Sequence, residues 1–335
     1  MGSSADAMVR EMRSWKVWLG YISLRLVIFV LAIAATGAID QWFEGNRDRS
    51  EHPASGHLVD MGGYRMHLYC SGIGSPTVVF DSGLSDSYLS WYRVRPEVAQ
   101  FTRACSYDRA GLGWSEPSPL PRNSGVFAEE LHALLHNAGI NGPFLLVGHS
   151  MGGYDVRIFA SRFRSEVTGM ILVDATHPDY ANLLPELRAG LESWRRQLKR
   201  QELLMPFGIP RLLEWCGNGP PEMRAELRAI ECNVPHLRES IAETLTTWDE
   251  SAAQVRASGS LGNLPLIVIS EDPAKNTPAF LSVFESGQEQ LAGLSSNSVR
   301  MTAIGSGHQI QRERPDLVIQ AIKNVFETTK GRPLK

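Results

Sequence analysis

A short segment in the middle of the chain predicts a strand, a sharp turn and a helix in direct succession. The apolar run Phe144 to Val147 is typical of a buried strand, and Tyr154 to Phe163 has the residue spacing of a helix. Between them stands Gly-His-Ser-Met-Gly-Gly, from Gly148 to Gly153. Glycines two positions before and after Ser150 allow the close backbone approach that such a turn needs. The Ser150 hydroxyl is therefore expected to be exposed at a strained turn, and the helix start beyond it favours negative charge.

Other short apolar runs alternate with helical patterns along the rest of the chain. This alternation predicts an α/β fold, with a mostly parallel central sheet flanked by helices on both faces. The expected strands are Tyr64 to Cys70, Thr77 to Phe80, Ala104 to Tyr107, Phe144 to Val147, Met170 to Val173, Leu266 to Ile269 and Val299 to Ala303. The sequence between Asp179 and Gly262 has helical spacing instead, so a helical cap is expected at about 178–262, inserted between strands six and seven.

The N-terminal segment differs from the rest because it is almost entirely apolar from Val17 to Ile39 and follows Arg10, Arg13 and Lys16. At about 1.5 Å per residue, this run is long enough for a hydrocarbon core of roughly 30 Å. Arg25 interrupts the run, and the uncharged remainder also has the length of a signal-peptide core. An uncleaved membrane anchor is favoured; a cleaved signal and a buried amphipathic helix are the alternatives. For an anchor or a signal, the basic flank stays cytoplasmic and the remainder is exported.

These patterns divide the chain into three parts. Residues 1–43 are the anchor or signal segment, and the charged stretch 44–56, which contains glycine and proline, is expected to be a linker. Residues 57–335 are expected to form the folded domain with its cap, since one α/β domain often exceeds about 250 residues. The formal net charge of −3 gives no indication of a nucleic-acid partner.

The four cysteines are expected to form disulfides if the domain is exported. Spacing favours Cys70 with Cys105 and Cys216 with Cys232, and four buried free thiols are the alternative. No Cys-x-x-Cys or His/Cys cluster with the spacing of metal ligands is recognised, so no metal site is expected.

From about His57 to Phe326 the chain resembles the α/β-hydrolase fold family, in particular its capped serine esterase and lipase-like members. The family places its catalytic histidine in a loop after the last strand, where this chain has Gly305-Ser306-Gly307-His308. The resemblance implies that Ser150 is the nucleophile and that His308 takes its proton. His149 is expected to be structural, since the turn points its neighbours away from the active face.

The resemblance also implies two backbone N–H donors that stabilise an oxyanion. One is the N–H of Met151, and the other is that of Leu84, in the loop after the strand Thr77 to Phe80. The family's usual His-Gly pair in this loop is replaced by Ser82-Gly83, so an ordinary glycine turn is the alternative here. Asp108 and Arg109 stand in a glycine-containing stretch that is similar to the family's Asp-x-x-Gly-x-Gly-x-Ser loop, and both are expected to be structural.

The acid that orients His308 is the point at which the chain departs from the commonest family pattern. Most members carry it as Gly-x-x-Asp after the seventh strand, but here that position reads Ser270-Glu271-Asp272-Pro273-Ala274. A minority arrangement places the carboxylate at the end of the sixth strand, where Asp174 stands. Asp174 is therefore favoured, with Asp272 or Glu271 as alternative acids.

The expected activity is hydrolysis of a carboxylic ester or related acyl compound through an acyl-serine intermediate, on a small-molecule substrate and without a cofactor. Amide, lactone and carbon–carbon bond hydrolysis and perhydrolysis remain open, because one triad supports them all. Epoxide hydrolases and haloalkane dehalogenases use a carboxylate nucleophile, so Ser150 argues against both. A non-catalytic, membrane-tethered binding protein is the alternative from another class.

The expected cap contains three large aromatic residues, Trp194, Phe207 and Trp215. They either line the substrate pocket or belong to the apolar faces that pack the cap helices into the domain.

Overall fold

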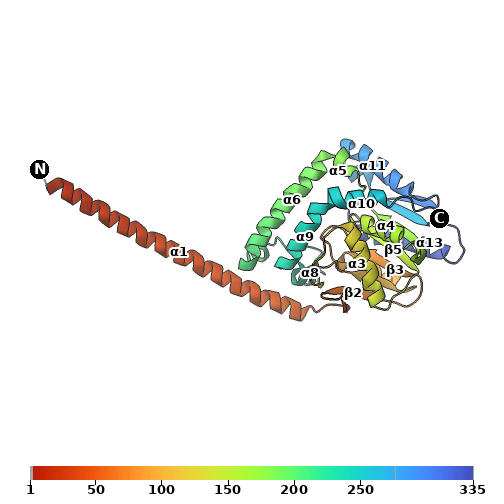
Figure 1. Cartoon of the computed structure of the whole chain (residues 1–335), viewed down its shortest axis with the longest axis horizontal. Coiled ribbons are helices and arrows are strands. Elements are labelled where there is room, and N and C mark those ends of the chain that lie inside the picture. The colour runs from red at the N-terminus through yellow and green to blue at the C-terminus, as the bar shows by residue number, and fades with distance from the viewer. Residues whose placement is uncertain (1–2, 276, 335) are drawn as a thin grey trace.

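The computed structural model describes residues 3–275 and 277–334. Eight strands form one sheet in the order β1-β2-β4-β3-β5-β6-β7-β8 (Figure 1). The strands are β1 (His57–Asp60), β2 (Arg65–Ser71), β3 (Thr77–Asp81), β4 (Ala104–Tyr107), β5 (Phe144–His149), β6 (Val167–Val173), β7 (Leu266–Glu271) and β8 (Ser298–Ala303). Strands β3 to β8 run parallel, and β2 runs antiparallel to both β1 and β4. The mostly parallel sheet expected from the sequence is confirmed.

Strand β1 has no counterpart among the expected strands. It has only four residues, lies at the edge of the sheet and is largely exposed. An edge strand of this length buries too little apolar surface to show a strand pattern in the sequence. Its pairing with β2, for example Leu58 opposite His67, defines it instead.

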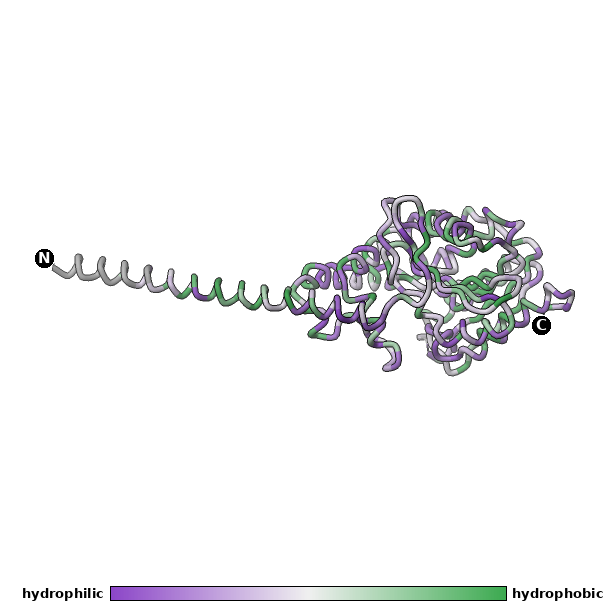
Figure 2. Tube along the Cα trace, turned by 90° about the horizontal axis from the view of Figure 1, so that it is seen from below, coloured by the Kyte–Doolittle hydropathy of each residue, from purple (hydrophilic) through white to green (hydrophobic). Residues whose placement is uncertain are grey.

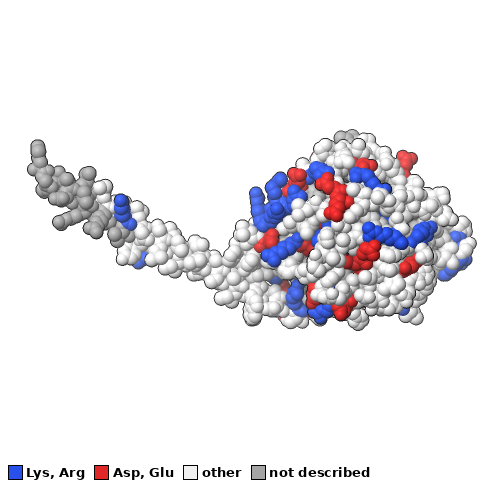
Figure 3. All heavy atoms as spheres, viewed as in Figure 1, with Lys and Arg blue, Asp and Glu red and all other residues white. Residues whose placement is uncertain are grey.

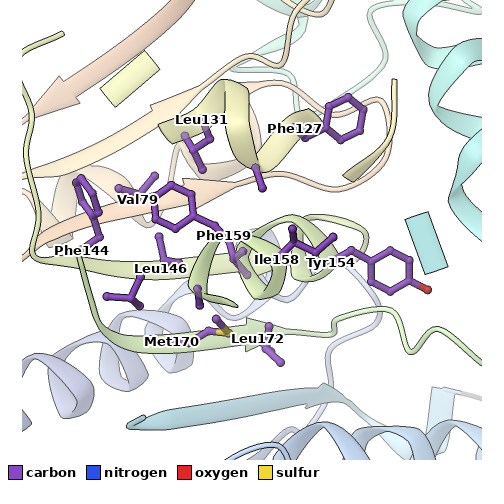
Figure 4. Close-up of a cluster of buried hydrophobic side chains, with 14 of the residues drawn as sticks. Val79, Phe127, Leu131, Phe144, Leu146, Tyr154, Ile158, Phe159, Met170 and Leu172 are labelled. Carbon is purple, nitrogen blue, oxygen red and sulfur yellow. The ribbon is translucent and has the colours of Figure 1, made fainter. Parts of the chain in front are cut away.

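Alternate residues of the central strands enter two separate cores, one on each face of the sheet. Val79 and Leu146 lie in the core beneath α3 (Ser124–Asn137) and α4 (Gly152–Arg162) (Figure 4). Val78 and Leu145 point to the opposite core, which α2 (Arg95–Val98) and α13 (Pro315–Thr328) cover. Each such side chain stabilises the fold by about 1.5–3 kcal/mol when fully buried. The two cores fix the positions of the strands, and the loops that carry Ser150 and Asp174 begin at the carboxyl ends of β5 and β6.

The cap is helical and lies between β6 and β7, where the sequence places it. It contains α5 (Tyr180–Leu183), α6 (Pro185–Leu204), η3 (Met205–Phe207), α7 (Ile209–Leu212), α8 (Arg224–Glu231), α9 (Val234–Thr246), η4 (Thr247–Ser251) and α10 (Ala252–Ala257). Other connections contain η1 (Tyr88–Trp91), η2 (Arg164–Glu166), η5 (Pro273–Lys275), α11 (Pro278–Ala292) and α12 (Ile310–Glu313). Two buried ion pairs join the cap to the sheet domain, Glu243 with Arg109 and Glu239 with Arg122.

Helix α1 (Ser3–Glu51) projects far beyond the domain (Figure 1). Its stretch from Trp18 to Glu51 is long and apolar enough to cross a membrane, and no other helix among the described residues meets that test. Figure 2 shows apolar residues along the projecting part of α1 and in the interior of the sheet. The side chains of Arg10 and Arg13 lie outside the described part of the chain.

The linker expected at 44–56 is corrected by the structure, because α1 continues as far as Glu51. Arg47 pairs with Glu44 and Glu51 at helical spacings, and these pairs stabilise the added turns. Pro53 is the first residue after the apolar run that cannot continue a helix. Only residues 52–56 connect α1 to β1.

Both disulfides favoured by spacing are present. Cys70–Cys105 joins β2 to β4, where the two cysteines are paired residues in the sheet. Cys216–Cys232 lies within the cap and closes the segment that contains α8. The alternative of four free thiols is thereby excluded in this structure.

Candidate active site

Ser150 lies at the turn between β5 and α4 and has a left-handed backbone, with φ of 53°. Its N–H donates to the Val173 carbonyl at 3.1 Å, and its own carbonyl accepts from Thr176. A Cβ at Gly148 would lie 2.6 Å from the Gly152 carbonyl oxygen, so the turn requires glycine there. The backbone is thus held in a strained form by β6 and by close packing, which fixes the direction of the hydroxyl.

His308 lies in the loop after β8 and contacts Ser150 and Asp174 at the same time. Its Nε2 is 3.0 Å from Ser150 Oγ, and its Nδ1 is 2.6 Å from Asp174 Oδ2. The Nδ1–H therefore donates to the carboxylate, and Nε2 is left as the acceptor for the serine hydroxyl. The structure brings together the serine, the histidine and the favoured acid.

Asp174 directly follows β6 and is buried, with φ of 43°. Its second oxygen, Oδ1, accepts from the Glu271 N–H at 2.8 Å, so both carboxylate oxygens have partners. Asp272, one alternative acid, instead accepts from the backbone N–H groups of Gly305 and Ala274. Asp174, the favoured candidate, is therefore hydrogen-bonded to His308 through its side chain, whereas Asp272 bonds to the backbone.

The protonation of His308 is set by two opposing effects. Burial lowers its pKa, but the hydrogen bond and the charge of Asp174 outweigh this effect, so the pKa of His308 is raised above 6.5. Its side chain remains about half exposed, at 49%, toward the pocket. The ring can therefore gain a proton on the pocket side while the carboxylate stabilises the charged form.

His149 precedes Ser150 and lines the same pocket, with its ring 4.7 Å from the His308 ring between centroids. Its Nε2 donates to the carbonyl of His308 at 2.9 Å. Burial and the neighbouring His308 hold the pKa of His149 well below 6.5, so its ring is neutral. His149 thus fixes the backbone of the loop that carries His308.

Of the two residues expected to supply oxyanion donors, Leu84 lines the pocket of Ser150, and Met151 directly follows Ser150 in the chain. In the described part of the chain, no backbone carbonyl accepts a hydrogen bond from the N–H of Met151 or of Leu84. The carbonyl of Gly83 accepts from Arg109 Nη2 at 2.6 Å. Because the C=O and N–H of a trans peptide point in opposite directions, the Leu84 N–H points away from Arg109. Arg109 therefore fixes the peptide that carries the Leu84 N–H, the second donor expected from the sequence.

Arg109 is itself held by buried carboxylates. Its Nε donates to Glu243 of α9 at 2.6 Å, and Nη1 donates to Asp81 at 3.0 Å. Glu243 also accepts from the Ser85 N–H at 2.8 Å, so it holds the loop from its other end. Burial raises the pKa of Asp81 to about 6, although the charge of Arg109 acts in the opposite direction. The sequence predicts a structural role for Arg109 but does not identify Glu243, because 134 positions separate the two residues.

Residues 78–321 match the model of the alpha/beta hydrolase family. The chain belongs to the alpha/beta hydrolase family. An uncharacterised protein of Schizosaccharomyces pombe is 34% identical over 242 residues, covering 70% of this chain and 43% of its own length. An uncharacterised vacuolar membrane protein of Saccharomyces cerevisiae is 32% identical over 142 residues, covering 37% of this chain and 22% of its own length. The chain thus spans less than half of either relative.

Solved structures show the same fold. The epoxide hydrolase CorEH is 20% identical with a TM-score of 0.62, covering 82% of this chain and 98% of that one. A thermophilic esterase from Thermogutta terrifontis is 23% identical with a TM-score of 0.58, covering 81% of this chain and 96% of that one. Membership in the alpha/beta hydrolase family supports a hydrolase activity for this chain.

The pocket of this family member has a volume of about 420 Å³ and lies between the sheet domain and the cap. Ser150, His308 and Leu84 line one side of it. The opposite wall is mostly apolar and comes from the cap, with Leu187, Leu191, Trp194 and Trp248. Of the three aromatic cap candidates, Trp194 therefore lines the pocket, whereas Phe207 and Trp215 are exposed elsewhere on the cap.

A second group of ligand-type side chains, which the sequence analysis did not recognise, lies outside this pocket. His132 and His136 are on α3, and Glu166 is in η2. The sequence signal was the spacing His-x-x-x-His, which places two imidazoles on one face of a helix. No residue of this group lines the pocket of Ser150.

Proposed function

We propose that this family member is a serine hydrolase that cleaves a carboxylic ester or a related acyl compound through an acyl-serine intermediate. The observation that carries the proposal is the continuous hydrogen-bonded series of Ser150, His308 and Asp174, at 3.0 and 2.6 Å. A nucleophile, a base within reach of it and an acid that orients the base are the parts that acyl transfer needs.

In the proposed reaction, Ser150 Oγ attacks the acyl carbon as its proton passes to His308 Nε2. The N–H groups of Met151 and Leu84 donate to the oxyanion of the tetrahedral intermediate. The intermediate collapses, the alcohol leaves with the proton from His308, and Ser150 carries the acyl group. Water then attacks the acyl carbon and gives its proton to His308; the carboxylic acid leaves and Ser150 regains its hydrogen.

The apolar cap wall supports an acyl or aromatic group as the part of the substrate that enters the pocket. Amide, lactone or carbon–carbon bond hydrolysis and perhydrolysis would use the same three residues. Epoxide or haloalkane cleavage through an alkyl-enzyme is disfavoured, because a serine occupies the position of the nucleophile. A non-catalytic binding protein would have no need of a strained serine aligned with a histidine.

We further propose that α1 is a retained membrane anchor and that the hydrolase domain lies outside the cytoplasm. The apolar stretch of α1 and the basic residues before it support this orientation. Two disulfides support an oxidising compartment.

Hydrolysis of p-nitrophenyl esters of graded acyl length tests the proposed activity. Within the capacity of the pocket, kcat/KM is expected to rise about fourfold per methylene, since burial of each contributes about 0.8 kcal/mol. Ser150→Ala should abolish turnover, whereas Ser161→Ala, on the helix α4 that follows Ser150, is the matched control. Turnover that is unchanged in Ser150→Ala would refute the proposal.

A further inference from the structure

Helix α1 does not leave the domain freely but is attached to the cap near the end of its apolar run. Gln41 Nε2 donates to the Cys232 carbonyl at 2.9 Å, and Arg211 contacts both Gln41 and Asp48. The backbone of Gly37 lies so close to the Phe207 carbonyl that a Cβ would collide with it. Gly37 belongs to the apolar run Val17 to Ile39. If that run crosses a bilayer, η3 of the cap lies at the membrane surface.

The cap segment at this level exposes large apolar side chains. Their exposed fractions range from 41% to 81%, and they are Leu203, Phe207, Leu212, Leu213 and Trp215. On α1 at the same level, Ile39, Trp42 and Phe43 are also exposed. Many large apolar side chains exposed on neighbouring segments are unfavourable in water and are typical of an interaction surface. Tryptophan is enriched at membrane–water boundaries.

The outer face of α6 adds positive charge beside these apolar residues. Arg196, Lys199 and Arg200 are exposed, and within the described part of the chain none of them has a carboxylate partner. An open hollow of about 540 Å³ is lined by Ser193, Arg196, Gln197, Arg200 and Trp215. Helix α6 lies on the side of the domain from which α1 departs (Figure 1), and basic side chains gather on that side (Figure 3).

The inner face of the same helix belongs to the candidate active site. Leu187, Leu191 and Trp194 of α6 line the pocket that contains Ser150. Helix α6 therefore separates the pocket from the surface described above. A substrate dissolved in the outer part of a bilayer would reach the pocket beside this helix.

We propose that α6 and residues 203–215 form a bilayer-contacting surface, on which anionic phospholipid headgroups bind in the hollow between Arg196, Arg200 and Trp215. The proposal rests on the membrane anchor proposed above. It identifies the substrate class as acyl lipids or other apolar esters that partition into the bilayer. Arginine suits phosphate because its planar guanidinium donates two parallel hydrogen bonds. The exposed apolar side chains of residues 203–215 would bury into the boundary between headgroups and acyl chains.

The test is amide hydrogen exchange on the full chain in lipid nanodiscs, one copy per disc. Discs of phosphatidylcholine alone are compared with discs that also contain phosphatidylserine, and with detergent micelles. Peptides that cover 193–200 and 203–215 should exchange most slowly in the anionic discs.

Substitutions on this surface should weaken the protection from exchange. Each of Arg196→Gln and Arg200→Gln should reduce the protection in anionic discs about fivefold, and Leu212→Ser should reduce it in both kinds of disc. Lys323→Gln on α13 and Ile73→Ser in the turn after β2 are matched controls.

Equal exchange of these peptides in anionic discs, neutral discs and micelles would overturn the proposal. So would equal protection by soluble glycerophosphate without a bilayer, or protection that requires two copies of the chain per disc. The measurement needs no turnover and should give the same result in Ser150→Ala. A failure of the lipid surface is therefore distinguishable from a failure of the proposed hydrolase activity.

A separate observation carries a second inference, at the group formed by His132, His136 and Glu166. The His132 and His136 Nε2 atoms lie 3.0 and 3.2 Å from the two oxygens of Glu166, and the three ligand atoms are all within 4.8 Å of one another. The His132 ring is held by stacking on Phe163, with ring centroids 3.6 Å apart. Two imidazoles and a carboxylate are a ligand set that suits Zn²⁺.

We infer that this group binds a divalent transition metal such as Zn²⁺ and links α3 to η2, contrary to the expectation from the sequence that no metal site exists. Calorimetric titration of the full, untagged chain with Zn²⁺ should show one site, and the melting temperature should rise with the metal. His132→Gln and His136→Gln should each weaken binding at least tenfold, whereas His57→Gln in β1 should not. Binding that is absent at millimolar Zn²⁺, or that survives both ligand substitutions, would overturn this inference.

Discussion

Glu243 of the cap accepts a hydrogen bond from Arg109 of the sheet domain at 2.6 Å, and both residues are buried. The same Arg109 donates to the Gly83 carbonyl, and Glu243 accepts from the Ser85 N–H. The peptide between Gly83 and Leu84 is therefore held from both domains. The cap contributes to the geometry of the proposed oxyanion site as well as to the wall of the pocket.

Glu243→Gln tests this positioning role. Loss of the charge should loosen the peptide that carries the Leu84 N–H and lower kcat up to about 100-fold, with little change in KM, because loss of a donor costs transition-state stabilisation. Glu239→Gln removes the other buried ion pair between cap and sheet domain and is the matched control, since Arg122 bonds to Glu239, Glu130 and the Ala110 carbonyl. Equal losses of kcat per folded enzyme in both variants would mean that Glu243 acts only through stability.

The pH profile of ester hydrolysis tests the role of Asp174. His308 must be neutral to act as a base. As the pH is lowered, kcat/KM should therefore decrease with an apparent pKa above 6.5. In Asp174→Asn the charge that raises this pKa is gone while burial remains, so the acid limb should move to lower pH. The rate should also fall by up to about 10⁴-fold.

Asp272→Asn and Glu271→Gln are the controls for this assignment. Asp272 accepts from the backbone N–H groups of Gly305 and Ala274, so its substitution should leave the acid limb of the profile in place. A loss below tenfold in Asp174→Asn, combined with a loss of thousands in either control, would transfer the role of the acid to the loop after β7.

The cap disulfide is expected to stabilise the part of the cap that holds α1. Cys216 and Cys232 are 16 positions apart, and closing a loop of this size is worth about 3 kcal/mol in the chain-entropy account. The double variant Cys216→Ala/Cys232→Ala should therefore unfold at a lower denaturant concentration than the wild type, as followed by circular dichroism. Thiol titration of the denatured, unreduced wild type should detect no free thiol; four reactive thiols would contradict both disulfides.

The topology of the anchor can be measured with a reporter enzyme that is active only after export. A fusion after Asp60 should be active, and a fusion after Lys16, which lacks the apolar run, should be inactive. The mature chain should retain its N-terminal segment in intact-mass analysis. A chain that begins near Ile39 would show that the segment is a cleaved signal instead.

The sequence predicts those features that depend on local spacing. The turn around Ser150, the strand runs and the cap insertion are encoded by neighbouring residues, and Asp174 could be favoured because it directly follows a strand. The extension of α1 to Glu51 was missed because a charged stretch with glycine looks like a linker until its ion pairs and its contacts with Arg211 are known. Glu243 was missed because only the packing of the cap on the sheet brings it to Arg109.

Labelling of the folded chain with a fluorophosphonate, which reacts with a serine that is activated as a nucleophile, tests the proposed role of Ser150. We expect one label per chain, located at Ser150 by peptide mass spectrometry, with ester hydrolysis lost in proportion to labelling. Ser150→Ala should take up no label, and Ser161→Ala should behave as the wild type. A folded wild-type chain that hydrolyses esters but is labelled at another residue, or that takes up no label and hydrolyses no ester, would show that Ser150 is not the nucleophile of a serine hydrolase.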